Sequence, residues 1–140
     1  DARLAHAEMS VGAVKGVEIG DGFEAAKAVG SVNNDDFCRN ADGTIGKRTN
    51  HSGGILGGMS DGSPVVLRAA FKPTPSISRP QQTVNRAGEE VETVIKGRHD
   101  PIIVPRAVVV VETMAAFTAA DLMLQNAVAK LDNVRKVYER

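Results

Sequence analysis

The sequence has a single cysteine, Cys38, in 140 residues. One thiol excludes an internal disulfide and a zinc site built from several cysteines. The three histidines, His6, His51 and His99, are too far apart to show the short spacing of metal ligands, so we expect no metal site. A reduced, cytoplasmic setting is the simplest expectation.

Aromatic residues and net charge are also scarce. There are four Phe, one Tyr and no Trp, whereas 42% of the residues are apolar, too many for a disordered chain. The core must therefore consist mostly of aliphatic side chains. A net charge of zero argues against nucleic acid as the main partner, because phosphate backbones select basic domains. Between Arg68 and Arg106, however, seven Lys or Arg stand against four Asp or Glu, which leaves room for a small-anion pocket.

The sequence lacks an uninterrupted hydrophobic run long enough to span a membrane. Its most apolar stretch, residues 102–124, is interrupted by Pro105, Arg106, Glu112 and Asp121. Charged residues are rare in spanning helices, so we expect no membrane partner, and we recognise no signal peptide. The first residues already show helical apolar spacing, without an initiator Met. We therefore expect the sequence to be part of a longer protein.

The pattern of apolar residues and turn formers predicts an α+β fold with antiparallel strands, two helices and long irregular segments. Turn-forming Asn, Asp and Gly predict a mobile excursion without regular structure, such as a lid, at 30–50. An Ala-rich run predicts one long buried helix over 107–130, although its β-branched start leaves a later beginning open. The polar residues 131–140 predict a frayed tail. The other predictions are a helix at 2–13, helical turns at 23–29, strands at 16–19, 64–71 and 90–96, and an irregular proline-rich stretch at 72–80.

Three segments could carry chemistry, and each has a purely structural alternative. The double-glycine segment 50–62 could bring backbone N–H groups against a phosphate or a flat ring. When this segment is considered without the other two, a tightly packed, bulged strand is the better interpretation. Segment 72–78 has a cation and three hydroxyls on a proline-stiffened loop. Such a loop could bind anionic oxygens with little loss of entropy, and the alternative is an ordinary surface loop. Segment 97–101 could bind an anion and move a proton, or hold a local Arg–Asp pair that closes a turn.

Taken together, the three segments resemble the consecutive signatures of the chorismate synthase family. The stretches NHSGGILGGMSDG at 50–62, FKPTPSI at 71–77 and GRHDP at 97–101 fit the family's order and intervals. HAEMS at 6–10, GAVKGVEIGDGF at 12–23 and the region 106–121 are similar as well. The resemblance implies that residues 1–140 are the C-terminal portion of a single chorismate synthase domain. It also implies part of a β-α-β sandwich, with antiparallel strands packed on long helices.

The resemblance implies a flavin-dependent lyase. The family converts 5-enolpyruvylshikimate 3-phosphate to chorismate by an anti-1,4-elimination of phosphate, a carbon–oxygen lyase reaction of the shikimate pathway that feeds aromatic amino-acid biosynthesis. Its cofactor is reduced FMN, with no net redox change, and NADPH is a candidate reductant of the flavin. The enzyme is typically a cytoplasmic homotetramer.

The resemblance also assigns roles to residues of this sequence. Asp100 matches an aspartate that helps proton transfer at the flavin, and Arg98 matches a flavin-site arginine. Gly57 matches a glycine that approaches FMN, and Asn33 falls near a flavin-contacting position. The loop around the flavin phosphate and ring is matched by Lys72, Pro73, Thr74, Pro75 and Ser76.

One part of the family's active site has no counterpart here. The two catalytic histidines and most of the substrate-gripping arginines lie in the family's N-terminal half, and none of the three histidines in this sequence matches them. We therefore expect this fragment to have no turnover alone. The alternative is a stand-alone, non-catalytic flavin- or nucleotide-binding module.

Overall fold

The computed structural model describes residues 1–139. Its fold is α+β, as the sequence predicts, with small antiparallel sheets and one long helix. In chain order the elements are α1 (Ala2–Met9), β1 (Val14–Ile19), the 3₁₀-helix η1 (Gly22–Lys27), α2 (Gly30–Asn33), β2 (Phe37–Arg39), β3 (Ile45–Lys47), β4 (Ile55–Leu56), β5 (Met59–Ser60), β6 (Leu67–Phe71), β7 (Gln81–Val84), β8 (Glu90–Thr93), α3 (Val104–Ala127) and α4 (Leu131–Tyr138).

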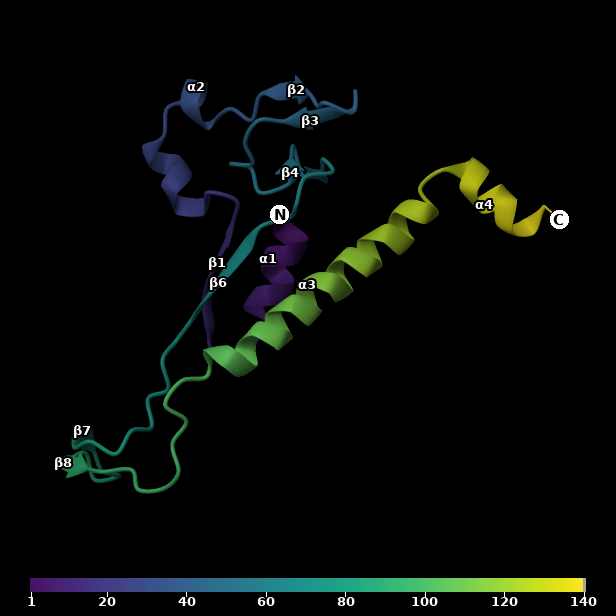
Figure 1. The fold of residues 1–140 in the computed structure, drawn as a ribbon. Helices are drawn as coiled ribbons and strands as arrows, with labels where there is room; N and C mark the ends of the chain where they lie inside the picture. The colour runs from purple at the N-terminus through teal and green to yellow at the C-terminus, as the bar shows by residue number, and fades with distance from the viewer. Residues whose placement is uncertain (140) are drawn as a thin grey trace.

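The centre of the structure is an antiparallel ribbon formed by β1 and β6 (Figure 1). Val17 pairs with Ala69, and a bulge interrupts the register between Val14 and Gly16. Helix α1 packs against both β1 and α3. The ribbon therefore joins two segments that are far apart in the sequence and places them beside the long helix.

Hairpins lie beyond both ends of this ribbon (Figure 1). The β2–β3 and β4–β5 hairpins lie at the end where β1 finishes and β6 begins. At the other end, residues 72–103 form an arm that leaves β6, turns through the β7–β8 hairpin and returns to α3. The two hairpin groups are thus held at opposite ends of one ribbon.

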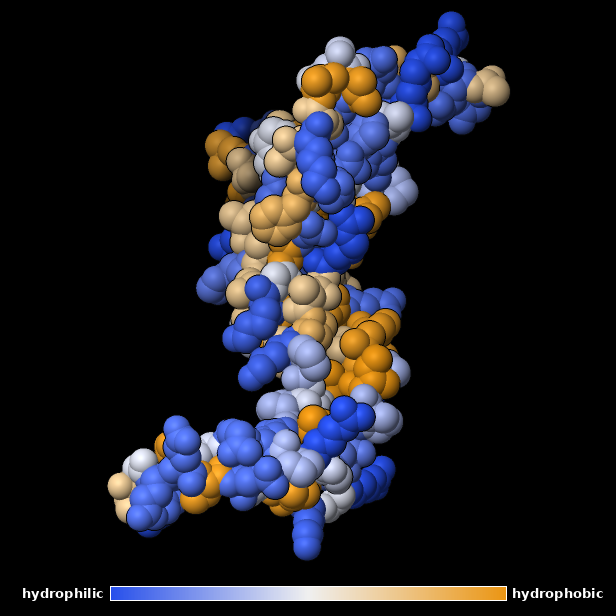
Figure 2. Space-filling model, turned by 90° about the vertical axis from the view of Figure 1, so that its left-hand side faces the viewer, coloured by the Kyte–Doolittle hydropathy of each residue, from blue (hydrophilic) through white to orange (hydrophobic). Residues whose placement is uncertain are grey.

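Helix α3 spans Val104–Ala127 rather than the predicted 107–130, and its apolar surface is exposed. Pro105 lies in its first turn, where the missing N–H leaves no hydrogen bond unmade, and the helix includes the β-branched run that left a later start open. The prediction of a buried helix is wrong for the described residues, because only 11% of its most apolar stretch is buried. Helix α1 packs against one side of α3, and apolar side chains gather at several places on the face shown in Figure 2.

Length and composition alone would let α3 cross a membrane. This is weak evidence, since core helices of soluble proteins have the same properties. The ion pair between Arg3 Nη2 and Asp121 Oδ2, 3.1 Å, joins the polar side of α3 to α1. The helix thus has a defined protein neighbour on that side.

The structure shortens the predicted first helix and adds elements that the sequence analysis missed. Helix α1 ends at Met9 rather than at residue 13, and the positive φ of 70° at Ala13 excludes that residue from a right-handed helix. Residues 30–50, predicted to lack regular structure, form α2 and the β2–β3 hairpin. Residues 131–138, predicted as a frayed tail, form α4, and β7 was not predicted.

One buried carboxyl group lies in the small core. Glu8 on α1 is 0% exposed, and neither of its carboxylate oxygens has a hydrogen-bond partner among residues 1–139. Burial raises the pKa of Glu8 above its ordinary value of 4.5. Since the folded-state pKa exceeds the unfolded one, Glu8 favours folding below pH 4.5 and loses this contribution as the pH rises through the folded-state pKa.

Replacement of Glu8 by Met is therefore expected to stabilise the protein at neutral pH, by about 1 kcal/mol, and to flatten the pH dependence of unfolding. Urea unfolding at pH 4.5 and pH 7.5 measures both effects. Glu24→Met, at an exposed glutamate paired with Lys27, is the control and should change stability by less than about 0.5 kcal/mol. A destabilised Glu8→Met variant at neutral pH would contradict an unpaired carboxyl group.

Candidate functional site

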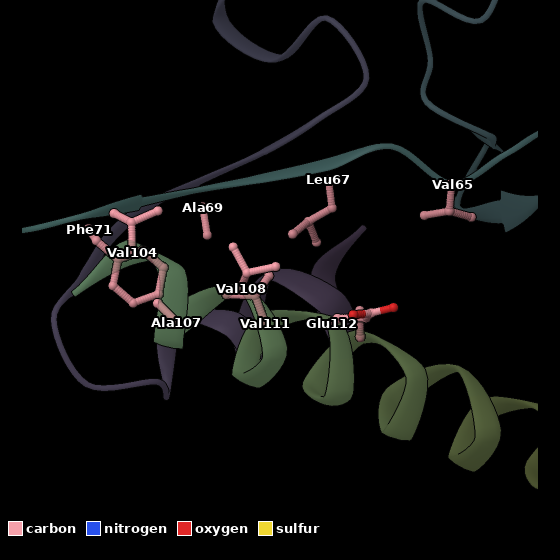
Figure 3. A pocket seen from close by; sticks show the side chains of 10 residues that line it. Val65, Leu67, Ala69, Phe71, Val104, Ala107, Val108, Val111 and Glu112 are labelled. Carbon is pink, nitrogen blue, oxygen red and sulfur yellow. The ribbon is translucent and has the colours of Figure 1, made fainter. Parts of the chain in front are cut away.

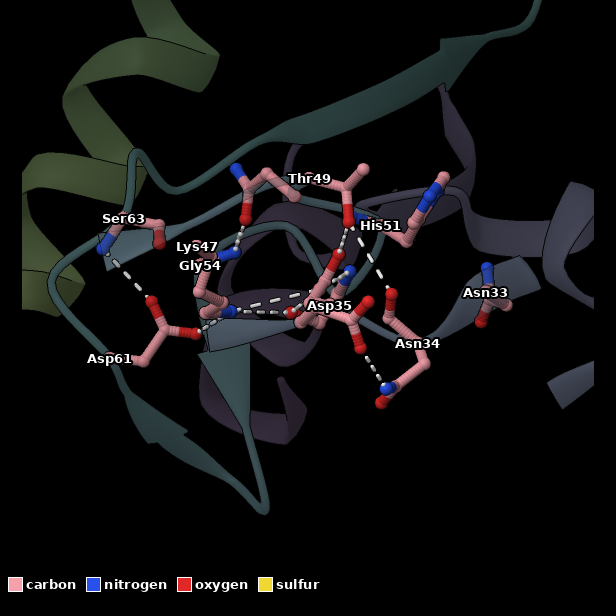
Figure 4. Close-up of polar contacts among 12 residues, drawn as sticks. Asn33, Asn34, Asp35, Lys47, Thr49, His51, Gly54, Asp61 and Ser63 are labelled. Carbon is pink, nitrogen blue, oxygen red and sulfur yellow. Dashed lines mark hydrogen bonds and ion pairs between the residues drawn. The ribbon is translucent and has the colours of Figure 1, made fainter. Parts of the chain in front are cut away.

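Two carboxylates hold the buried ammonium group of Lys47 beside the double-glycine segment (Figure 4). Lys47 Nζ lies 2.5 Å from Asp61 Oδ2 and 3.6 Å from Asp35 Oδ2. The side chains of Lys47 and Asp35 are each 4% exposed. Asp35 also accepts hydrogen bonds of 2.7 to 2.9 Å from the backbone N–H groups of His51 and Ser52 and from the hydroxyls of Thr49 and Ser52. The Asp35 cluster, as we call it, consists of Asp35, Lys47, Thr49, His51, Ser52 and Asp61.

The electrostatics of this cluster keep its groups charged. Burial opposes ionisation of Asp35, but the hydrogen bonds from Ser52, Thr49 and His51 outweigh it and hold the pKa of the carboxyl far below 3.8. The contact with Lys47 lowers the pKa of Asp61, and Asp61 in turn raises the pKa of Lys47. Groups that keep their charge near neutral pH do not exchange protons there. The Asp35 cluster therefore orders residues 30–63 and is not an acid–base centre.

The glycines of the double-glycine segment have two different surroundings. Gly53 and Gly54 are buried, and a Cβ on Gly53 would lie 2.3 Å from the backbone nitrogen of Gly20. These glycines permit tight packing of backbone on backbone. Gly57 and Gly58 connect β4 and β5 with positive φ values of 59° and 80°, and a Cβ on either would meet no atom within 4 Å. Their backbone is therefore open to a ligand.

A carboxylate at the end of β1 connects this segment to α2. Asp21 Oδ2 lies 2.6 Å from His51 Nδ1 and accepts a hydrogen bond of 3.0 Å from Asn33 Nδ2. The backbone is joined as well, since Asp21 N donates to His51 O at 2.8 Å. Asn33, assigned to the flavin by resemblance, is thus fixed beside the double-glycine segment.

The arm carries the remaining predicted site residues. Lys72 begins it, and its backbone N–H donates to Ala13 O at 2.8 Å, which anchors the arm to the ribbon. The side chains of Lys72 and Arg98 are exposed and make no ion pair within residues 1–139. Asp100 is paired with Arg106 at the start of α3 rather than with Arg98. The local Arg–Asp pair considered for segment 97–101 is therefore not formed; Asp100 instead joins the segment to α3, and Arg98 stays available to an anion.

The structure places the predicted site residues in two groups. Asn33 and Gly57 lie at the end of the ribbon with the β4–β5 hairpin, and the others lie on the arm at the opposite end (Figure 1). The arm group consists of Lys72, Pro73, Thr74, Pro75, Ser76, Arg98 and Asp100. Residues 1–139 therefore do not bring the predicted residues into one pocket.

A separate apolar groove lies between β6 and α3 (Figure 3). It has a volume of about 440 Å³, and Glu112 is its only charged lining residue. Its apolar walls include Leu67 and Phe71 from the ribbon and Val104 and Val108 from α3. None of the residues assigned by the resemblance lines it. Such a groove suits apolar side chains better than a phosphorylated ligand.

Sequence reasoning missed the Asp35 cluster and the Asp21 contacts. Asp35 is one of the turn formers of residues 30–50, and Lys47 and Asp61 lie 12 and 26 positions beyond it in the sequence. No short motif connects residues at such separations. A lysine next to a turn-rich segment has no sequence pattern that shows it will be buried, because its burial depends on contacts between distant residues.

Comparison with known proteins identifies the family. A family model described as chorismate synthase matches residues 1–124. The chorismate synthase of Lachnoclostridium phytofermentans is 64% identical over 140 residues, covering 100% of this chain and 38% of that protein. The chorismate synthase of Archaeoglobus fulgidus is 61% identical over 125 residues, covering 89% of this chain and 34% of that protein.

A solved structure agrees with these relatives. The crystal structure of a chorismate synthase superposes with a TM-score of 0.69 and 35% identity, covering 99% of this chain and 34% of that chain. The chain belongs to the chorismate synthase family. It corresponds to the C-terminal part of these proteins and spans little more than a third of their length.

Proposed function

We propose that this chain forms part of an enzyme that converts 5-enolpyruvylshikimate 3-phosphate to chorismate by anti-1,4-elimination of phosphate. The reaction makes it a carbon–oxygen lyase of the shikimate pathway. The observation that carries the proposal is identity of 64% to a chorismate synthase over the full length of the chain. All three motif segments lie within the stretch matched by the family model.

The cofactor in this proposal is reduced FMN. Each of the two separated groups of residues suits one part of it, and a single site requires the rest of the enzyme to bring those parts together. The open backbone of Gly57 and Gly58 permits close approach of a flat ring, and Asn33, held by Asp21 at the same end of the ribbon, has a polar side-chain amide. Lys72 and Arg98 are exposed cations without an ion-pair partner in residues 1–139, as a phosphate group requires. Bound in its reduced form, FMN supplies an electron that it recovers, so the elimination has no net redox change. NADPH is the proposed source of reducing equivalents.

On the arm, the proline-braced loop would hold the flavin phosphate. Thr74 and Ser76 offer hydroxyl donors, and Pro73 and Pro75 restrict the backbone, which lowers the entropy lost on binding. Gln81 Nε2 donates to Pro75 O at 3.0 Å and ties this loop to β7. Asp100 would exchange the proton during the reaction, in a position fixed by its contact with Arg106.

The exposed apolar surface supports a larger assembly. We assign the cover of α3 and of the β6–α3 groove to the remainder of the polypeptide, in a cytoplasmic homo-oligomer that is a tetramer at full length. Arg106 and Glu112 on α3 are poorly suited to lipid contact, which favours a protein cover over a membrane. A net charge of zero supports a small-molecule substrate rather than nucleic acid.

The chain alone is expected to show no chorismate formation above the rate without enzyme. The reason is that its predicted site residues lie in two separated groups, and the family's catalytic histidines are not among them. The test is turnover under anaerobic conditions with reduced FMN, with this chain alone and with the N-terminal part of the L. phytofermentans enzyme added. Robust turnover by the chain alone would contradict the expectation.

FMN titration of the same samples separates the proposal from its alternative. Tight FMN binding with turnover only in the combined sample supports a chorismate synthase fragment. Tight FMN binding without turnover in the combined sample, together with no turnover by the full-length protein, would support a non-catalytic flavin- or nucleotide-binding module instead.

A further inference from the structure

We propose that the outer edge of β7 is an interaction surface that pairs with the same edge of a second copy of the protein. This inference rests on the homo-oligomer of the proposed function and deepens it by naming a contact. Within residues 1–139, β7 pairs only with β8, and no other helix or strand packs extensively on this hairpin. An isolated two-stranded hairpin is only marginally stable in water, so a further contact is expected.

The side chains of the hairpin do not form an apolar face that would pack in a core. All residues of the two strands except Gln81 and Val91 are exposed. On one face Gln81 lies opposite Thr93. On the other face Gln82 lies opposite Glu92. A hairpin that is mostly polar on both faces gains little from being covered by a core, and its unpaired backbone edges remain as the contact surface.

The register of the hairpin determines which backbone groups point outward. Asn85 N donates to Glu89 O at 3.0 Å, so these two residues form a hydrogen-bonded pair. Hydrogen-bonded and non-hydrogen-bonded pairs alternate along an antiparallel ladder, which places Gln82 and Val84 in non-hydrogen-bonded pairs. The N–H and C=O groups of Gln82 and Val84 therefore point away from β8 and form the outer edge of β7.

Two such edges fit each other around a two-fold axis at Thr83. In an antiparallel pair, Gln82 of each copy exchanges hydrogen bonds with Val84 of the other. Thr83 then lies opposite Thr83 of the second copy in a non-hydrogen-bonded pair, where Thr–Thr contacts are favourable. Strand β7 has no charged side chain, so the symmetric pair brings no like charges together.

The outer edge of β8 is unsuited to the same pairing. A symmetric pair around Val91 would place Glu90 of each copy directly opposite Glu92 of the other, and like charges in that position destabilise a sheet. Pairing of β7 with β8 of another copy would not close and would lead to open fibres. The β7 edge is therefore the one that fits a second copy, whereas the glutamates protect the β8 edge.

The first test is cross-linking of the full-length protein of which this chain is a part. Thr83→Cys places two thiols at the two-fold axis, where the Cα atoms are about 4.5 Å apart, a separation that a disulfide can span. We expect most of the variant to become a covalent dimer under mild oxidation. Val91→Cys, directly opposite Thr83 in the hairpin, is the matched control. It should cross-link no more than the wild type, which accounts for any reaction of Cys38.

A second pair of variants tests association without a new covalent bond. Val84→Pro removes an outward N–H from β7, and Glu92→Pro removes one from β8, while the hydrogen bonds within the hairpin are kept. We expect Val84→Pro to weaken self-association about 10-fold or more, because two hydrogen bonds between the copies are lost. Glu92→Pro should leave it unchanged. Sedimentation velocity over a dilution series measures both.

The outcomes separate this contact from the proposed function. An oligomeric wild type in which Thr83→Cys forms no additional cross-link, or in which the two proline variants have equal effects, overturns the β7 contact alone. In that case the rest of the polypeptide or another partner covers the edge. A monomeric wild type overturns the homo-oligomer and this inference with it. An oligomeric wild type that forms no chorismate overturns the proposed reaction, and the cross-linking result still decides the contact.

Discussion

Asp100→Asn is expected to lower kcat of the full-length enzyme by about 100- to 10,000-fold, the range that general acid–base catalysis contributes. The substitution keeps the size of the side chain and an acceptor for Arg106, but it removes the carboxylate that we propose as the proton-transfer group. Arg98, the proposed anion-binding side chain of this segment, is unchanged in the variant. We therefore expect the rate of the chemical step to fall and the binding of FMN to be largely retained. Single-turnover kinetics with reduced FMN under anaerobic conditions measure that step.

Two comparisons make the Asp100 result specific. FMN affinity should change less than threefold, and Asp132→Asn, an exposed aspartate on α4, should retain wild-type kcat. If Asp100→Asn loses FMN affinity and turnover to the same extent, Asp100 has a binding role rather than a role in proton transfer. Wild-type turnover by the variant would remove Asp100 from the reaction altogether.

Asp35→Ala is expected to lower the free energy of unfolding of the full-length enzyme by about 3 kcal/mol. The change leaves Lys47 buried with one of its two carboxylates and leaves two backbone N–H groups, those of His51 and Ser52, without their acceptor. Low pH should act in the same direction. The pKa of Asp35 is depressed in the folded protein, so its stabilisation is present above the unfolded value of 3.8 and is lost as the pH falls through the folded-state pKa.

Asp36→Ala is the matched control for this substitution. Asp36 adjoins Asp35 but is exposed, and within residues 1–139 its carboxylate accepts only from the amide of Asn34. It should change the free energy of unfolding by less than about 0.5 kcal/mol in urea titrations. Equal effects of the two substitutions would show that the network around Lys47 does not hold residues 30–63.

Much of the candidate site could be read from the sequence because its parts are local. The double-glycine, lysine–proline and Arg-His-Asp segments each consist of adjacent residues, so their order and intervals are visible before folding. The family match over residues 1–124 confirms the resemblance they suggested. The roles of the individual residues stay predictions, since they depend on a ligand and on groups outside this chain.

Local pattern was a poorer guide where tertiary contacts override it. The many Asn and Asp residues of 30–50 favour turns, yet the segment forms α2 and a hairpin. The reason is that Asp35 accepts hydrogen bonds from residues 49–52 and lies close to Lys47, which holds the segment in place. The apolar run in α3 predicted a buried helix, but burial requires a partner surface, and within residues 1–139 helix α1 is the main element that packs on it.

The sequence by itself determined the family, the α+β class and the chemical character of the three motif segments, because these depend on residue types at short range. Tertiary structure alone decided that Asp21 joins Asn33 to His51, that Lys47 lies between two carboxylates, and that Asp100 pairs with Arg106 rather than with Arg98. Contacts between distant residues depend on how the chain folds back on itself, and a linear pattern does not contain that information. For the same physical reason, the two groups of site residues at opposite ends of the ribbon became visible only in the fold.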